Sequence, residues 1–414
     1  MKKIKTAIIG GGASGLILFS SLFDKQNVLL FERGERVGRK LSATGNGQGN
    51  VSNLCVLQEE YFSSERSSAL RIGEILRAFD NHSLTEWFLR RGVLLCADDR
   101  GRVYPTGRQA SALTDALRFS LAREQGEIAL NSCVSAISKR GKDFLLKVKT
   151  AEGEKEYLAE NVVLCAGGKA AKNFGTDGSA YALAESLGHT VTPLYPSLVQ
   201  LKTDTTHIKP LKGIRVNGGV LTAYFEESGE KRSETGDIIF TDYGVSGDAT
   251  FRLSAFLTDK IGMGKKVRLS IDFLPDISET EIYKLLTEKK SAYPDLSTNE
   301  LLFGIVNNQI GRAIFKRANN DVRKAAKLVK DFSLSITGTL GFDYAQVTKG
   351  GVLLSETDEN LESRFVKGLY FAGEILDVDG QCGGYNLQWA YSSAQTVAAA
   401  LNKTTFDSKD RGQV

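Results

Sequence analysis

The 414-residue sequence predicts an α/β fold in which helices cover a parallel sheet. Three observations lead to this prediction. Apolar strand patterns at residues 4–9 and 27–32 flank a helical pattern at residues 13–23, which makes a βαβ unit. A similar pattern closes the chain, with a strand at residues 368–372 and a helix from about residue 384 to 401. The length exceeds what one hydrophobic core usually fills, so two or three structural units are expected.

The middle of the chain supplies elements of both kinds. We expect helices at residues 67–79, 83–91 and 108–123, then strands at 129–137, 144–150 and 156–164 that return to the sheet with an inserted antiparallel hairpin. Beyond about residue 192, short strand patterns at 199–201, 220–225, 237–240 and 267–271 precede a Lys-rich helical block, 278–330, and a strand at 331–337.

These patterns divide the chain into two parts of one sheet domain and an insert. The sheet domain is predicted at residues 1–192 and 350–414. The insert is predicted as a β-rich substrate or cap domain at 193–277, a small helical domain at 278–330 and a return to the β-rich domain at 331–349. The final dozen residues look frayed.

Composition excludes several classes of protein. A formal net charge of +4 with scattered basic residues argues against a dedicated nucleic-acid binder. Five cysteines without a CxxC pair argue against a disulfide framework or a zinc site, so no metal is expected and a reducing cytoplasm fits best. No run of 18 apolar residues exists, which argues against a membrane span. The sequence does not predict an oligomeric state.

The first βαβ unit carries a dinucleotide-binding fingerprint. Gly10, Gly12 and Gly15 form GxGxxG between strand and helix, and Glu32 ends the next strand. The glycines permit a tight turn, close approach to a pyrophosphate and packing of helix on strand, while the helix N-terminus attracts the anion. Glu32 is expected to accept hydrogen bonds from both ribose hydroxyls. A glycine turn without a ligand is the competing interpretation.

The loop after this unit favours FAD over NAD. Arg39 and Lys40 precede a run of small residues and amides. Such a loop can wrap a longer cofactor, and Asn46, Asn50 and Asn53 supply donors and acceptors for the edge of a flavin ring. In isolation the same residues also fit a solvated Gly/Asn loop.

Two later glycine-rich stretches are expected to complete the site. "VVLCAGG", residues 162–168, ends an apolar strand where backbone can approach a nucleotide, although a plain turn also needs glycine there. In "GEILDVDGQCGGYNLQWA", Gly373 and Glu374 would reach the ribityl and pyrophosphate part of FAD. The helix that starts around Gly384 would point free N–H groups at the pyrimidine end of the flavin, where a positive helix end stabilises the reduced ring. A helix N-terminus with a Gly-rich approach and no ligand is the alternative.

Five segments resemble one family along nearly the whole chain: GGGASG, GRKLSATGNGQGNVSN, residues 176–201, FTDYGVSG and GEILDVDGQCGGYNLQWA. They are similar to the HI0933-like flavoproteins, also called BaiN-like or aminoacetone-oxidase-like FAD-binding proteins. The resemblance implies a Rossmann-type FAD domain of the two-dinucleotide-binding flavoprotein type, formed by both chain ends, with inserted β-rich and small helical domains. It also implies FAD contacts at Gly10, Gly12, Ala13, Ser14, Gly15, Glu32, Arg33, Arg39, Lys40, Gly45, Val134, Ala166, Gly167, Gly373, Glu374, Asn386 and Leu387.

The chain departs from the family pattern at two places. Gln48 and Gly49 stand where Arg-Cys is usual, which puts a cationic or thiol role beside the flavin in doubt. Asp248 stands where Pro is frequent, on what would be the substrate side.

The expected function is that of an FAD-dependent oxidoreductase that passes hydride between a small organic substrate and the flavin. Because only one dinucleotide fingerprint is present, NAD(P)H would bind transiently. Two enzyme classes stay open: a reductase of activated double bonds that uses NAD(P)H, and an amine-type oxidase that uses oxygen. No catalytic acid or base is assigned. Tyr385 and Cys382 are weak candidates, Tyr195 and Asp242 weaker ones, and structural roles are preferred because no partner base is visible.

A flavin-binding regulatory or RNA-modification-associated protein is the alternative from another class. A basic face on the helical block would favour it, formed by Lys289, Lys290, Lys316, Arg317, Arg323, Lys324, Lys327 and Lys330. A solvated charged face is the preferred interpretation of these residues.

Overall fold

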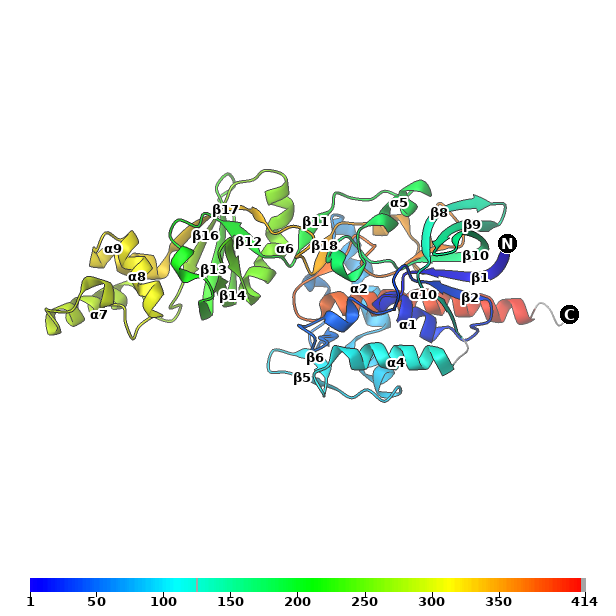
Figure 1. Ribbon diagram of the computed structural model, residues 1–414, viewed down its shortest axis with the longest axis horizontal. Helices are drawn as coiled ribbons and strands as arrows, with labels where there is room; N and C mark the ends of the chain where they lie inside the picture. Colours follow the sequence, from blue (N-terminus) through cyan, green and yellow to red (C-terminus); the bar gives the residue numbers. More distant parts are fainter. Residues whose placement is uncertain (124–125, 411–414) are drawn as a thin grey trace. The chain divides into compact units, whose positions relative to one another are not determined.

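The computed structural model describes residues 1–123 and 126–410. They form two compact units, which can be followed by colour along the chain in Figure 1. Unit 1 comprises residues 1–194 and 347–414, as far as these are described, and unit 2 comprises residues 195–346. Unit 1 is therefore built from both ends of the chain. The finer division of the insert into a β-rich and a helical domain stays a prediction.

Unit 1 is an α/β structure around one large sheet. Its strands are β1 (Lys2–Ile9), β2 (Val28–Phe31), β3 (Ser52–Asn53), β4 (Tyr61–Phe62), β5 (Leu95–Ala97), β6 (Arg102–Pro105), β7 (Glu127–Ala129), β8 (Cys133–Arg140), β9 (Asp143–Thr150), β10 (Gly153–Leu164), β18 (Val347–Lys349), β19 (Leu369–Phe371) and β20 (Asp379–Gly380). Its helices are α1 (Ala13–Ser21), α2 (Ala69–Ala78), α3 (Asn81–Leu89), α4 (Ala110–Arg123), α5 (Ser179–Ser186) and α10 (Tyr385–Asp410).

The sheet is parallel at its centre and antiparallel at one side. Its order is β7-β2-β1-β10-β9-β8, and β19 also pairs with β10. The pairs of β1 with β2 and β10, of β2 with β7 and of β10 with β19 are parallel, whereas β8, β9 and β10 form an antiparallel meander. The parallel part of the sheet is apolar and buried at residues 7–9 of β1, throughout β2 and at residues 162–164 of β10, as expected where both faces of a parallel sheet are covered. The Rossmann-type fold expected from the sequence is confirmed.

The register of the parallel strands brings four strand ends together. Ile9 lies opposite both Phe31 and Leu164, and Leu164 lies opposite Phe371. The loops that follow these four residues therefore leave the same edge of the sheet. In open α/β sheets this carboxyl edge is where ligands bind.

One predicted strand was wrong. Residues 129–137 were expected to form a single strand, but the chain turns at Leu130–Ser132 and makes β7 and β8 instead. Asn131 adopts a left-handed φ of 51°, and its N–H donates to the Gly34 carbonyl. Asn tolerates this conformation better than most residues, so the turn carries only a weak sequence signal.

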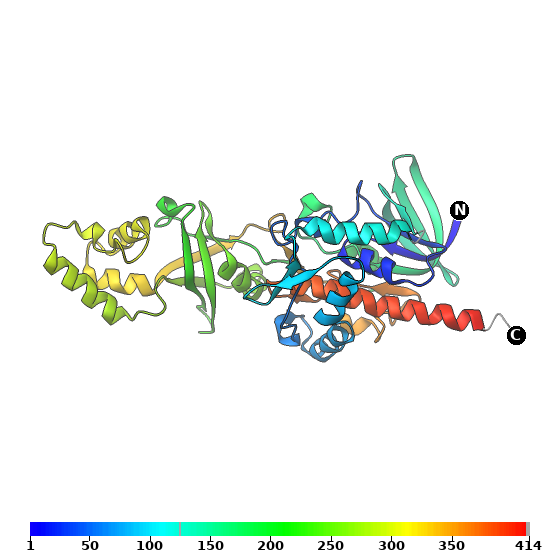
Figure 2. The ribbon, with the colours of Figure 1, turned by 90° about the horizontal axis from the view of Figure 1, so that it is seen from below.

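Three helices lie together on one side of the sheet (Figure 1). α1 contacts α10 and α4, and Figure 2 shows α4 and α10 from that side. α1 is buried almost all round, with Leu16, Ile17, Leu18 and Phe19 inaccessible to solvent. α10 extends to residue 410 rather than 401, because the helix continues into a polar segment that lacks the apolar periodicity from which its end was predicted. The hairpin of β5 and β6 was not predicted.

Unit 2 contains a closed antiparallel barrel. The barrel order is β12-β15-β14-β13-β16-β17. The strands of unit 2 are β11 (Tyr195–Ser197), β12 (Leu201–Thr203), β13 (Arg215–Phe225), β14 (Lys231–Phe240), β15 (Gly244–Ser246), β16 (Val267–Asp272) and β17 (Phe332–Thr339). Its helices are α6 (Asp248–Gly262), α7 (Glu279–Ala292), α8 (Asn308–Arg317) and α9 (Val322–Lys330).

The barrel and the helices after it share a hydrophobic core. Buried residues of the barrel strands, such as Leu269 and Phe332, belong to the same cluster as Ile314 and Phe315 of α8 and Val329 of α9. Helix α6, which was not predicted, packs against β13, β14 and β15. No element was expected between the strand patterns at residues 237–240 and 267–271, although Leu253 and Leu257 lie four residues apart on the buried face of this helix.

Candidate functional site

The turn between β1 and α1 is shaped by two close approaches that only glycine allows. Gly10 has φ +108°, and a Cβ there would lie 2.6 Å from the Cα of Ala166. A Cβ on Gly15 would lie 2.0 Å from the Gly10 carbonyl oxygen. The fingerprint glycines therefore let the first and second glycine-rich stretches touch, and let α1 start directly at the strand end.

The N-terminus of α1 is open. Gly12 is its N-cap, no side chain caps it, and the first turn contains no acidic residue. A Cβ built on Gly12 would meet no protein atom within 4 Å. The conformation of Gly12, with φ −83°, does not itself require glycine. The missing side chain instead keeps space in front of the helix N–H groups, which suits a phosphate group.

Glu32 lies beside this turn, at the end of β2. Its Oε2 accepts the N–H of Gly11 at 2.9 Å, and its Oε1 accepts the N–H of Gly34 at 2.7 Å. Each carboxylate oxygen has a second lone pair, so the side chain is held in place and can still accept further hydrogen bonds. This arrangement is compatible with the predicted ribose contact.

Arg33 and Val134 lie next to Glu32. Ser132, just before β8, donates its N–H to the Glu32 carbonyl, and β8 has an irregular register between Val134 and Ala136. Arg33 Nη1 pairs with Asp177 Oδ1 at 2.7 Å, and this hydrogen bond holds the pKa of the Asp177 carboxyl well below its usual range. Glu32, Arg33 and the start of β8, which includes Val134, are thus neighbours at one edge of the sheet.

The basic pair after the fingerprint reaches two later segments. Lys40 Nζ pairs with Glu374 Oε2 at 2.8 Å, and both side chains are largely shielded from solvent. Glu374 Oε1 accepts the N–H of Thr348 at 3.0 Å. Arg39 Nη2 donates to the Asn173 carbonyl at 2.8 Å. Lys40 and Glu374, two residues from opposite ends of the chain that are expected to contact FAD, therefore form an ion pair with each other.

The Gly/Asn loop is held largely by its own amides. Asn50 Nδ2 donates to the carbonyls of Ser52 and Val103, both at 3.0 Å, which leaves Oδ1 as its available polar atom. Gly45 has φ +58°, and Asn46, with φ +55°, is exposed. The structure thus uses the donors of Asn50 for backbone, which sequence reasoning could not see because strand β6 was not predicted.

Gly373 joins the two ends of the chain. It has φ +81°, and a Cβ there would lie 2.0 Å from the Oγ of Ser14 in the first turn of α1. Its N–H donates to Ser393 Oγ at 2.9 Å, and its carbonyl accepts the Trp389 indole N–H at 3.2 Å. Nearby, Ala166 and Gly167 follow β10, and Gly167 has φ +73°. The predicted cofactor contacts of three separate stretches are therefore brought to one place.

The segment that leads into α10 lies against the start of strand β3. A Cβ on Gly384 would lie 2.1 Å from the Ser52 carbonyl oxygen. The side chain of Asn386 holds the preceding loop: Oδ1 accepts the Gly380 N–H at 2.9 Å, and Nδ2 donates to the Gly380 carbonyl at 2.7 Å. Only the backbone of Asn386 and Leu387 can thus serve a ligand. The first turn contains no acidic residue, which leaves the positive end of the helix uncompensated.

Tyr385 and Cys382 flank this helix start. The Tyr385 side chain is nearly buried, and burial raises the pKa of its phenol to about 12. Tyr61 donates its Oη hydrogen to the Tyr385 carbonyl at 3.0 Å, and the two rings meet edge to face. At neutral pH Tyr385 is therefore a phenol that can donate a proton. Cys382 is half-buried.

Sequence reasoning missed one buried carboxyl in the same segment. Asp377 accepts the N–H of Ser64 at 2.9 Å and the hydroxyls of Ser63 and Ser64. Burial raises the pKa of this carboxyl, and the hydrogen bonds from Ser64 act against that rise. Asp377 thus ties the C-terminal loop to the segment before α2. No local sequence pattern indicates this contact, because Ser63 and Ser64 lie more than 300 residues earlier in the chain.

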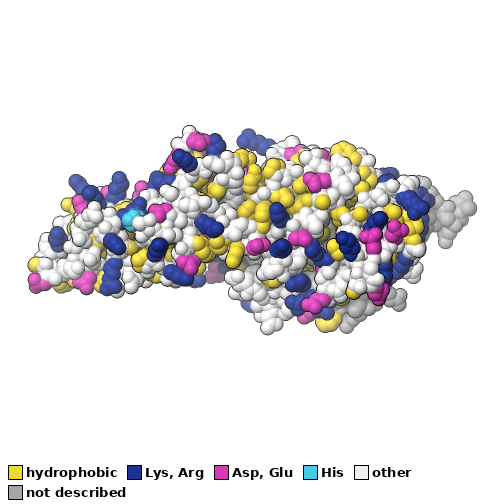
Figure 3. All heavy atoms as spheres, turned by 45° about the horizontal axis from the view of Figure 1, so that its top comes forward, with side chains coloured by type: hydrophobic (Ala, Val, Ile, Leu, Met, Phe, Trp, Pro, Cys, Tyr) yellow, Lys and Arg dark blue, Asp and Glu magenta, His cyan; other side chains and the backbone are white. Residues whose placement is uncertain are grey.

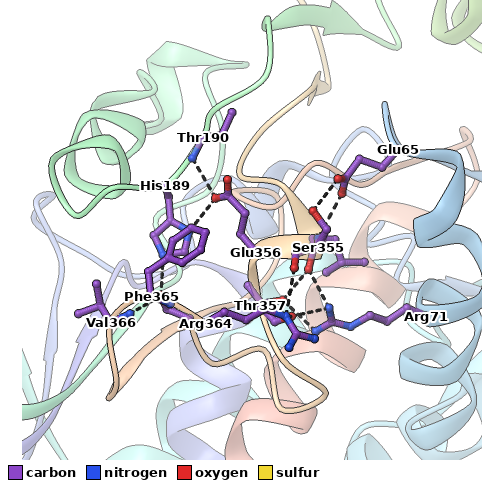
Figure 4. Close-up of polar contacts among 12 residues, drawn as sticks. Glu65, Arg71, His189, Thr190, Ser355, Glu356, Thr357, Arg364, Phe365 and Val366 are labelled. Atoms are coloured by element: carbon purple, nitrogen blue, oxygen red, sulfur yellow. Dashed lines mark hydrogen bonds and ion pairs between the residues drawn. The ribbon is translucent and has the colours of Figure 1, made fainter.

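His189 takes part in a buried chain of polar contacts beyond α5 (Figure 4). Its Nδ1 lies 3.0 Å from Glu356 Oε2, and its Nε2 lies 2.8 Å from Ser363 Oγ. The arrangement resembles a hydrolase triad, but Ser363 is buried and its Oγ accepts the N–H groups of Phe365 and Val366. With its lone pairs used, Ser363 is a tether of the segment before β19 and not a nucleophile.

A groove in unit 1 lies away from these residues. A groove of about 950 Å³ is lined by residues of α1, α3 and α10 that include Trp87, Arg90 and Asn402. None of the predicted site residues lines it. Among residues 1–123 and 126–410, no group of His, Cys, Asp and Glu has the arrangement of a metal site. In the same residues no helix combines the length and apolarity that crossing a bilayer requires.

Comparisons with known proteins agree with this architecture. The family model described as HI0933-like protein Rossmann domain matches residues 4–400. A 3-dehydro-bile acid delta(4,6)-reductase of Clostridium scindens is 32% identical over 412 residues, which are 96% of this chain and 98% of that protein. A ribosomal RNA dihydrouridine synthase of Escherichia coli is 29% identical over 424 residues, with 97% and 98% covered. The structure of 3-ketosteroid delta1-dehydrogenase from Sterolibacterium denitrificans has a TM-score of 0.50 at 12% identity, covering 98% of this chain and 100% of that one, which is a likeness of fold alone.

Proposed function

Because the chain belongs to the HI0933-like Rossmann-domain family, we propose that it is an FAD-dependent oxidoreductase that reduces a carbon–carbon double bond conjugated to a carbonyl group. The observation that carries the proposal is the contact of Gly373 with Ser14 in front of an open α1 N-terminus. It brings the glycine-rich segments from both chain ends next to each other, which supports a shared site. A mononucleotide would need only the first of these segments.

The residues present fit FAD. The space at Gly12 suits the pyrophosphate, and the first N–H groups of α1 would bind it. Glu32, already oriented by the N–H groups of Gly11 and Gly34, would accept hydrogen bonds from the ribose. At the other end of the cofactor, the N-terminus of α10, whose first turn contains no acidic residue, would donate to the flavin pyrimidine. These contacts are proposals, and they use the residues predicted from the sequence.

FAD, when bound, supplies hydride transfer. The chain's own residues orient the ring and handle the proton. The positive end of α10 favours negative charge at the pyrimidine edge. Reduction of a conjugated double bond needs a hydride at one carbon and a proton at the other. We assign the proton to Tyr385 Oη, because its phenol is protonated at neutral pH and lies at the start of α10.

The chemistry is supported by what two relatives are named for. One name describes reduction of delta-4 and delta-6 double bonds in a 3-dehydro bile acid, and the other describes formation of dihydrouridine in ribosomal RNA. In a 4,6-unsaturated 3-oxo steroid and in uracil alike, the reduced double bond is conjugated to a carbonyl group. The shared reaction class is therefore proposed for this chain, with NAD(P)H as the transient hydride donor.

An anaerobic absorption experiment tests the reaction class. The FAD-loaded protein should lose its visible flavin absorption on addition of NADPH or NADH, and a conjugated enone should restore it. An amine-type oxidase, the other enzyme class left open by the sequence, would instead be bleached by an amine and restored by oxygen with release of hydrogen peroxide. Bleaching by an amine but by neither nicotinamide would overturn the proposal.

A further inference from the structure

Helices α8 and α9 of unit 2 carry an excess of positive charge. Residues 308–330 contain Arg312, Lys316, Arg317, Arg323, Lys324, Lys327 and Lys330 and one carboxylate, Asp321. On the face of unit 2 visible in Figure 3, Lys and Arg side chains are spread over the surface. A strongly basic surface is the electrostatic signature of a partner with many negative charges.

Some of these cations have structural partners and can be set aside. Arg317 donates to the carbonyl and hydroxyl of Ser333. Lys330 pairs with Asp272 at 2.8 Å. Lys289, which the sequence also placed on the basic face, donates to the carbonyls of Leu301 and Phe303. These three side chains serve the fold of unit 2.

The remaining cations form what we call the α8–α9 surface: Arg312, Lys316, Arg323, Lys324 and Lys327. All five are exposed. None forms an ion pair with a residue in the part of the chain that the structure describes. Other exposed cations of unit 2 do, for example Lys212 with Asp242 and Lys265 with Glu227. These two lysines are thus neutralised by carboxylates, whereas the α8–α9 surface combines five exposed cations on two adjacent helices without such a partner.

The helices that carry the α8–α9 surface pack against each other and against neighbouring parts of unit 2. α8 packs against α9 and against the short 3₁₀ helix Lys209–Leu211. The pKa of His207 is lowered, chiefly by burial and further by Arg317 and Lys316, so these cations lie near it; Asp204 acts in the opposite direction. Lys316 and Arg317 thus lie near His207, and the other cations of the α8–α9 surface lie on the two helices that pack against each other.

Helix stability does not explain the whole set. Cations in the last turn stabilise a helix, which accounts for Lys316 in α8 and Lys327 in α9. Arg323 and Lys324 instead lie in the first turn of α9, where positive charge is unfavourable. Side chains kept at a cost to the helix point to a role other than folding.

We propose that the α8–α9 surface binds the phosphates of an RNA strand. The inference rests on the proposed function, because uracil in RNA offers the conjugated double bond that the reaction reduces. Arg323 also lies over the ring of Tyr283, 5.5 Å from its centroid, and Tyr283 is 38% exposed, so a flat base-stacking element adjoins the cations. A lipid surface fits less well, because no large apolar side chain of α8 or α9 is exposed for insertion.

RNA binding is tested with the full-length, FAD-loaded protein. The triple variant Lys316→Glu/Lys324→Glu/Lys327→Glu removes positive charge from the α8–α9 surface. A matched control, Lys142→Glu/Lys231→Glu/Lys266→Glu, makes the same change in net charge at exposed lysines elsewhere. The probe is deproteinised ribosomal RNA, and binding is measured over a range of KCl concentrations. Phosphatidylglycerol vesicles are the second probe.

The wild type and the control should bind RNA with a steep salt dependence. The surface variant should bind at least about tenfold more weakly, and its slope of log affinity against log salt should be smaller by roughly 2 to 3. Equal affinity of surface variant and control, or binding to vesicles and not to RNA, would overturn the proposal. Flavin bleaching by NAD(P)H is recorded for every variant, so that a failure of the proposed oxidoreductase is seen separately from a failure to bind RNA.

Discussion

The glycine at position 12 has an unusual property among the glycines of the site. Its φ of −83° is open to any residue, and an added Cβ would touch no protein atom. The fold therefore does not need glycine there, whereas a bound pyrophosphate would. A substitution at position 12 can therefore test pyrophosphate binding without disturbing the fold.

We predict that Gly12→Ala leaves the thermal unfolding midpoint of the FAD-free protein within about 2 °C of the wild type, and weakens FAD binding at least tenfold, roughly 1.4 kcal/mol. Fluorescence quenching of FAD on titration measures the affinity. Gly107→Ala is the matched control, because a Cβ at Gly107 also meets no protein atom and this residue is outside the predicted site. Unchanged FAD affinity in Gly12→Ala would refute the pyrophosphate assignment.

Tyr385 offers a test of proton transfer. Tyr385→Phe removes the phenol that we assign as the proton donor, while the ring and the main chain that accepts the Tyr61 hydrogen bond stay. Flavin reduction by NADPH should be unchanged, and reoxidation by an enone should slow by about 10²-fold or more. Stopped-flow absorption separates the two steps.

Tyr61→Phe is the control for this prediction. It removes only the hydrogen bond to the Tyr385 carbonyl, so it should cost about 1 kcal/mol of stability and leave the reoxidation rate within a few-fold of the wild type. If both variants slowed reoxidation equally, Tyr385 would be acting through packing and not as an acid.

His189 predicts a dependence of stability on pH. Burial lowers its pKa from the ordinary value of 6.5, although Glu356 acts in the opposite direction. Ser363 Oγ already accepts two N–H groups, so it must donate its hydrogen to Nε2, and a protonated imidazole would have no acceptor there. The neutral form is favoured by folding; its contribution is present above pH 6.5 and is lost as the pH falls below that value.

The thermal unfolding midpoint of the wild type should therefore decrease when the pH is lowered from 7.5 to 5. In His189→Gln the midpoint should be lower at pH 7.5, because Ser363 and Glu356 lose a buried partner, and the further loss at pH 5 should be smaller than in the wild type. Parallel pH profiles for the two proteins would show that His189 does not titrate as this arrangement requires.

At the scale of the element, the first turn of α9 connects stability with binding. Asp321 caps this helix by accepting the N–H of Lys324, and that hydrogen bond holds the pKa of Asp321 below its usual value. Lys324 occupies the position where a Glu would complete a capping box. The sequence thus retains a cation where an acid would stabilise the helix.

Lys324→Glu should raise the free energy of unfolding by roughly 0.5 kcal/mol, because it places negative charge at the positive end of α9. The same variant should weaken RNA binding. Urea denaturation and RNA binding are measured on the same preparation. A loss of RNA affinity together with a loss of stability would point to damage of the helix instead of removal of a phosphate contact.

The elements show why sequence reasoning succeeded in some places and failed in others. β1, α1 and β2 were predicted because apolar strands and a glycine fingerprint are local signals. The break at Leu130–Ser132 and the hairpin of β5 and β6 were missed, since they depend on backbone pairing with Gly34 and on short strands with weak alternation. α6 was missed because its buried face is recognised only once the barrel against which it packs is known.

The same division holds for the site. Motifs predict the glycines and Glu32 as site residues, which stays a prediction, and the register of β1, β2, β10 and β19 explains why their loops meet. The ion pair of Lys40 with Glu374 joins residues 334 positions apart, and no local pattern carries that information. Asp377 was missed for the same reason, because its partners lie more than 300 residues earlier in the chain.

At the scale of the whole molecule, the account makes unit 1 a single binding domain closed by the two ends of the chain. The contact of Gly373 with Ser14 is its structural basis. Unit 2 is an insert with its own core, and its α8–α9 surface is assigned a separate role in holding an RNA substrate. In this proposal, residues of unit 1 carry out the reduction and residues of unit 2 select the RNA substrate.

The most direct test of the central claim is the visible absorption spectrum of the protein after incubation with FAD and gel filtration. The account predicts that flavin absorption elutes with the protein at about one FAD per chain, and that Gly12→Ala elutes largely without it. Elution of all flavin as free FAD from the folded wild-type protein would contradict the account.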